Sequence, residues 1–133
     1  MTQIVISCEP NLETVAVDLM SSLQRGGDIV VCANRDLQLN NDWQRAMGAA
    51  IKNAELLVLI GKAEWLRHDP IQTYLIGLAS GHNCQTRLLT DYPAECQWLV
   101  ENVDNVTAES FKGIAEYGVG ENSRANRALA LTG

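Results

Sequence analysis

Short apolar runs alternate along the chain with longer segments in which apolar residues recur at helical spacing. Strands are predicted at Ile4–Ser7, Asp28–Ala33, Glu55–Gly61 and Thr86–Thr90, and a weak fifth strand at Val103–Thr107. Most of these runs are apolar in succession rather than at alternate positions. That pattern is typical of parallel strands that are covered on both faces.

The segments between the strands predict helices. Asn11 is expected to cap the first helix, which Gly26 and Gly27 end, and Asp42 to cap a second helix over 42–54. A third helix begins near Asp69, with proline in its first turn, and lies in a segment without Asp, Glu, Lys or Arg between Asp69 and Arg87. Residues 62–70 are expected to form a loop. Two short helices are predicted at 93–102 and 108–118.

This order of elements predicts an α/β fold. We expect a three-layer α/β/α sandwich around a doubly wound parallel sheet of about five strands, in the flavodoxin-like order 2-1-3-4-5. Residues 1–118 are expected to form one domain, and 119–133 a C-terminal tail that is frayed or docks on a partner. Ligands of such sheets bind beyond the carboxyl ends of the strands, here between the first and third. The residues expected to line that cleft are Ser7 to Asn11, Asn34 to Asp36, Gly61, Lys62, Glu64, Trp65 and the start of the third helix.

Composition excludes several classes of partner. The chain has 133 residues and a net charge of −6, without the clustered basic residues that nucleic acids or anionic membranes require. No apolar run is long enough to span a membrane, and the N-terminus does not resemble a signal peptide. The four cysteines form no C-x-x-C pair and the two histidines lack zinc spacing, so we expect reduced, buried thiols, no metal site and a cytoplasmic protein.

The loop after the first strand lacks the glycine-rich phosphate motifs. Ser7 and free backbone N–H groups could still hold a phosphate or a ribose, or Ser7 could simply end the strand. Cys8 precedes a helix N-terminus, which would lower the pKa of its thiol as in a phosphatase. The C-x5-R loop of such enzymes is missing, and a structural cysteine is therefore favoured.

Two further loops carry candidate chemistry. Arg35 could pair with a phosphate or carboxylate and Asp36 with ribose hydroxyls, while Trp43 follows at the next helix; a salt-bridged loop is the alternative interpretation. In the loop after the third strand, Trp65 offers an aromatic face and Glu64 and Asp69 are the acids. His68 could act as a base, but no nucleophile is visibly paired with it, and a solvated loop is the alternative.

The pattern resembles that of TIR domains (Toll/interleukin-1 receptor type). The matching pieces are "VIS" (Val5–Ser7), "RD" (Arg35 and Asp36), Trp43, "AAIKNAELLVLIG" (Ala49–Gly61) and "EW", over roughly Ile4 to Thr90. The nucleoside 2-deoxyribosyltransferase family has the same general architecture, with a helix motif close to E-[IL]-G-x-A. Ile76, Gly77 and Ala79 fit that motif.

The resemblance to either family implies an enzyme that acts on N-glycosidic bonds. Such an enzyme uses a Glu on the helix after the third strand to stabilise C1 of the ribose. The resemblance puts that Glu at Leu75, or at Gln72 or Thr73 by looser spacing, and none of these is an acid. A leucine cannot stabilise the positive charge that develops at C1. Glu64 and Asp69 are the substitute acids within reach in the sequence.

Three functions follow as hypotheses. The favoured one is a TIR-like or deoxyribosyltransferase-like domain that binds a nucleotide or nucleoside without cleaving it and carries no resident cofactor. The second is an active N-glycosidase or transferase on NAD or a nucleoside. The third is a homotypic interaction module, with a homodimer formed through the Arg35–Asp36 loop and the charge-free helix. The candidate ligand-binding residues are Ser7, Glu9, Asn11, Arg35, Asp36, Trp43, Gly61, Trp65, Gln72 and Leu75.

Overall fold

A parallel β-sheet forms the centre of the protein in the computed structural model, which describes residues 2–34, 42–92 and 94–117, with side chains up to Thr107. Within these residues the sheet has four strands in the order β2-β1-β3-β4. They are β1 (Gln3–Cys8), β2 (Ile29–Cys32), β3 (Leu56–Ile60) and β4 (Gln85–Leu89). The α/β class and the parallel sheet are confirmed, and the strand order agrees with the first four strands of the predicted topology.

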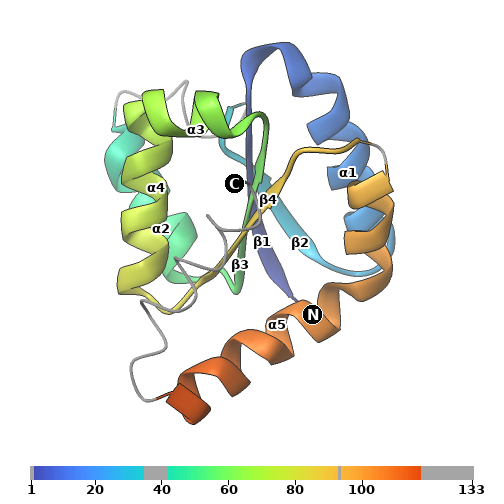
Figure 1. Ribbon diagram of the computed structural model, residues 1–133, viewed down its shortest axis with the longest axis vertical. Helices are drawn as coiled ribbons and strands as arrows, with labels where there is room; N and C mark the ends of the chain where they lie inside the picture. Colours follow the sequence, from blue (N-terminus) through green and yellow to red (C-terminus); the bar gives the residue numbers. More distant parts are fainter. Residues whose placement is uncertain (1, 35–41, 93, 118–133) are drawn as a thin grey trace.

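Helices cover both faces of the sheet and make a three-layer sandwich (Figure 1). One face carries α1 (Glu13–Arg25) and α5 (Ala94–Tyr117), and the other carries α2 (Trp43–Lys52) and α4 (Pro70–Gly81). The short α3 (Ala63–His68) lies at the carboxyl end of the strands. Because both faces are covered, every residue of β3 is buried, which explains why that strand is apolar throughout rather than at alternate positions.

The predicted fifth strand is wrong. Residues 103–107 lie within α5, which also joins the two short helices predicted at 93–102 and 108–118 into one. The buried residues Leu99, Val103 and Val106 recur at intervals of four and three, which is the period of a helix face. Asp104 and Asn105 between them are exposed, so the apolar residues form a stripe against the sheet rather than a buried strand.

Helix starts follow the predictions in part. Asn11 does not cap α1, because it lies in the single 3-10 turn η1 (Pro10–Leu12) and α1 begins at Glu13. Asp42 occupies the position before α2 but makes no capping hydrogen bond with its side chain. The third helix, α4, begins at Pro70, close to the predicted start. Its cap was not predicted: Asp69 Oδ1 accepts a hydrogen bond of 2.9 Å from the backbone N–H of Ile71.

Two further predictions concern a loop and the thiols. The segment predicted as a loop at 62–70 contains α3 instead, where Leu66 is buried and anchors the turn. All four cysteines are free and buried, as expected. Helix α1 ends at Arg25, with Gly26 as the C-cap residue. Gly27, the next residue, has a φ of 97°, a left-handed conformation that favours glycine. In the described part of the chain, no helix is long and apolar enough to cross a membrane.

Candidate functional site

The carboxyl ends of β1 and β3 lie side by side and define the candidate site. Ser7 is paired with Leu59 and Cys8 with Ile60 in the sheet register. The backbone N–H of Glu9 donates to the carbonyl of Ile60 at 2.9 Å, which continues the pairing past the strand ends. Glu9 and Gly61 therefore leave the sheet at the same edge, where ligands of doubly wound sheets bind.

Ser7 and Gln72 form a buried polar pair beneath this edge. The Ser7 hydroxyl donates to Gln72 Oε1 at 2.8 Å, and the two residues are 0% and 1% exposed. The bond joins the end of β1 to the first turn of α4, 65 positions along the chain. The pair sets the position of α4 on the sheet, because a buried polar group is costly unless it is hydrogen-bonded.

Trp65 is held against Gly61 at the end of β3. A Cβ placed on Gly61 would lie 2.5 Å from Trp65 Cε3 and 2.9 Å from Glu9 Cγ, so only glycine fits there. The indole N–H of Trp65 donates to Asp69 Oδ2 at 3.2 Å, while the other oxygen of Asp69 caps α4. Asp69 thus fixes both the aromatic ring and the helix, and its two oxygens are engaged in structure rather than free for chemistry.

A shallow cleft opens beside the Trp65 ring. It holds about 260 Å³ and is lined by Glu9, Lys62, Glu64, Trp65 and His68. Glu9 Oε1 accepts a hydrogen bond of 2.7 Å from the backbone N–H of Lys62, which fixes the carboxylate at the wall of the cleft. The cleft therefore combines one aromatic face with two carboxylates, one ammonium group and one imidazole.

Leu75 does not face this cleft. Its side chain is 0% exposed and packs in the core between α4 and the sheet, in a cluster with Val5, Leu57 and Leu59. The position that the resemblance assigned to a carboxylate is therefore a core position in this protein. Among the described residues, no group of three His, Cys, Asp or Glu side chains lies close enough to hold a metal ion.

Cys8 is a structural thiol and not the activated thiolate of the phosphatase alternative. Burial raises its pKa from 9.0 to about 12, with further increases from Cys32, Glu13 and Glu9. Its backbone N–H donates to Asn34 Oδ1, and Asn34 Nδ2 donates back to its carbonyl, each at 2.9 Å. Asn34 thereby ties the end of β1 to the chain that leaves β2.

The remaining predicted residues lie apart from the cleft or outside the described residues. Trp43 on α2 packs edge-on against Tyr74 on α4, with ring centroids 5.8 Å apart and planes at 74°, so it joins two helices. Asn11 is exposed in η1. Arg35 and Asp36 lie outside the described residues.

Tyr92 is a residue of this edge that the sequence analysis missed. Its hydroxyl is buried and has no hydrogen-bond partner among the described residues. Burial, followed by the nearby Glu9 carboxylate, raises the pKa of Tyr92 to about 12. Since Tyr92 lies shortly after the end of β4, the rule that selected the residues after β1 and β3 would have selected it as well.

Comparisons with known proteins give one structural neighbour. No protein-family profile matches the sequence, and no curated protein matches it. The fold is similar to a chain in the crystal structure of the RPS4 and RRS1 TIR domain heterodimer, at 16% sequence identity and a TM-score of 0.47. The match covers 85% of this chain and 95% of that one. Similarity at this level does not establish a family.

Proposed function

We propose that the protein is a TIR-like or deoxyribosyltransferase-like domain that binds a nucleoside or mononucleotide in the cleft beside Trp65 and does not cleave it. The observation that carries this proposal is the ring of Trp65, held by Asp69 and seated directly on Gly61. An aromatic ring fixed before binding stacks on a base at low entropic cost.

The polar groups around the ring fit the rest of such a ligand. The carboxylates of Glu9 and Glu64 can accept hydrogen bonds from ribose hydroxyls, and Lys62 and His68 can contact a phosphate. The volume of about 260 Å³ is slightly smaller than most ligand pockets, which enclose roughly 300–1,000 Å³. This size supports a mononucleoside or mononucleotide rather than a dinucleotide.

The absence of cleavage follows from the roles of the acids. Leu75 is in the core and Asp69 uses both oxygens for structure. One oxygen of Glu9 accepts from the backbone N–H of Lys62, and Glu64 is exposed on α3. An exposed carboxylate stabilises a developing positive charge weakly, because water screens it. We therefore expect binding without release of the base.

The test is a titration of the full chain with adenosine, AMP, deoxyadenosine and NAD, followed by thermal shift and calorimetry. Trp65→Leu is expected to weaken binding by between about fivefold and about 150-fold, since stacking on one base contributes roughly 1–3 kcal/mol. Trp98→Leu is the matched control, because Trp98 is exposed on α5 away from the cleft.

Two outcomes would contradict the proposal. If none of the four compounds shifts the melting temperature or gives a binding isotherm, the cleft is not a nucleoside site. If chromatography shows free base after incubation with any of them, the protein is an active N-glycosidase, and the binding-only conclusion is wrong. A stable dimer with no ligand response would instead favour the interaction module.

A further inference from the structure

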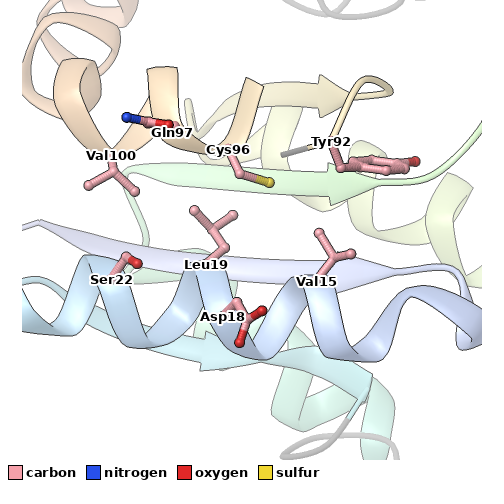
Figure 2. A pocket seen from close by; sticks show the side chains of 8 residues that line it. All are labelled: Val15, Asp18, Leu19, Ser22, Tyr92, Cys96, Gln97 and Val100. Atoms are coloured by element: carbon pink, nitrogen blue, oxygen red, sulfur yellow. The ribbon is translucent and has the colours of Figure 1, made fainter. Parts of the chain in front are cut away.

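A groove between α1 and α5 lies on the face of the sheet opposite α2 and α4, and Tyr92 at one end of it is close to Glu9 of the cleft beside Trp65. The groove holds about 560 Å³. Val15 and Leu19 of α1 point toward α5, Cys96 and Val100 of α5 point toward α1, and Tyr92 lies at one end (Figure 2). The lining residues are Val15, Asp18, Leu19, Ser22, Tyr92, Cys96, Gln97 and Val100.

The groove is apolar along its floor and carries one acid. Val15 and Leu19 from α1 and Cys96 and Val100 from α5 provide the apolar surface. Asp18 is exposed beside Leu19, and it has no salt-bridge partner among the described residues. Such a groove fits an extended or helical segment that has aliphatic side chains and one cation.

The chain itself contains a segment of this kind. Arg127, Leu129 and Leu131 occur at every second position in "RALAL", and no acid lies between Asn122 and Gly133. In an extended backbone these three side chains point to the same side. In the same backbone, Ala128 and Ala130 point to the opposite side, which therefore carries only small side chains.

The chain length permits this segment to reach the groove. From Val100 to Tyr117, α5 rises about 25 Å at 1.5 Å per residue. The ten residues from Tyr117 to Arg127 can span about 33 Å when extended. A segment that turns back along α5 therefore brings Arg127 to the Val100 end of the groove first.

We propose that the groove between α1 and α5 binds residues 127–131 of the same chain in an extended conformation. Arg127 pairs with Asp18, Leu129 packs against Leu19 and Cys96, and Leu131 reaches Val15 and Tyr92. The occupied groove makes the C-terminal segment an intramolecular ligand, which a basic-aliphatic peptide of a partner could displace.

The test uses the full chain and a thiol probe at the groove. Gln97→Cys places an exposed thiol at the lining, whereas the four native thiols are buried. In this background, Leu129→Asp with Leu131→Asp should raise the maleimide labelling rate about tenfold, because the groove is then open. The matched control, Ala128→Asp with Ala130→Asp, should leave the rate unchanged. A second probe, Trp98→Cys, sits one residue along α5 and should be insensitive to both pairs.

The charge pairing is tested by reversal. Asp18→Arg should accelerate labelling at position 97, and Arg127→Asp added to Asp18→Arg should restore the slow rate. An equal rate in all variants would overturn the proposal. A rate that falls as protein concentration rises would also overturn it, because the occupant would then be a second copy of the chain. Circular dichroism of each variant checks that the fold is intact.

Discussion

Replacement of Leu75 by Glu tests whether this position belongs to the core or to the ligand cleft. Leu75 is 0% exposed and packs with Val5, Leu57 and Leu59. Truncation to Ala removes these contacts and leaves a cavity, which costs about 2–5 kcal/mol. Leu75→Glu loses the same contacts and also buries a carboxyl group, so we expect a larger loss at neutral pH.

The loss in Leu75→Glu should depend on pH in a defined direction. Burial raises the pKa of a carboxyl group above its unfolded value of about 4.3. Below that value the group is protonated in both states, so only the lost packing remains. As pH rises above it, the unfolded state is ionised first, and the variant loses about 1.4 kcal/mol per pH unit until the folded pKa is reached.

The assay is urea unfolding followed by far-UV circular dichroism, for wild type, Leu75→Ala and Leu75→Glu at several pH values between 4 and 7. The quantity compared is the free energy of unfolding of each variant minus that of wild type at the same pH. Leu75→Ala should give a difference that does not change with pH. A Leu75→Glu protein as stable as wild type, or one whose deficit is independent of pH, would refute the assignment of Leu75 to the core.

Three shorter predictions concern the carboxyl edge of the sheet. Gly61→Ala should destabilise the protein by about 1–3 kcal/mol in urea unfolding and shift the tryptophan emission, because its Cβ would lie 2.5 Å from Trp65 Cε3. Asp69→Ala should cost at least about 1 kcal/mol, because the cap on Ile71 and the bond to Trp65 are both lost; unchanged stability would contradict these bonds. The Cys8 thiol should resist maleimide at pH 8 in the native protein, and its raised pKa of about 12 should reduce stability as pH rises above 9, since only the unfolded thiol then ionises.

The sequence by itself determined the four strands β1 to β4, because their apolar runs follow from burial on both faces of a parallel sheet. It also determined the start of α4 near Asp69 and the edge at which Ser7, Glu9 and Gly61 meet, since each depends on local spacing or on a topological rule. The predictions that nucleic acid is not a partner and that no zinc site is present rest on the acidic charge balance and on the cysteine spacing, which are properties of the linear chain.

Only the tertiary structure decided which side chains are buried in the core and which line the cleft. Residues 103–107 read as a weak strand because two valines flank polar residues, and only packing against the sheet made them one stripe of a longer helix. The resemblance assigns a carboxylate to the position of Leu75, but burial in the core gives this residue a packing role. The ring of Trp65 became a candidate platform because Gly61 and Asp69, four residues before and after it, meet it in space. Such contacts depend on side-chain direction, which a linear pattern does not specify.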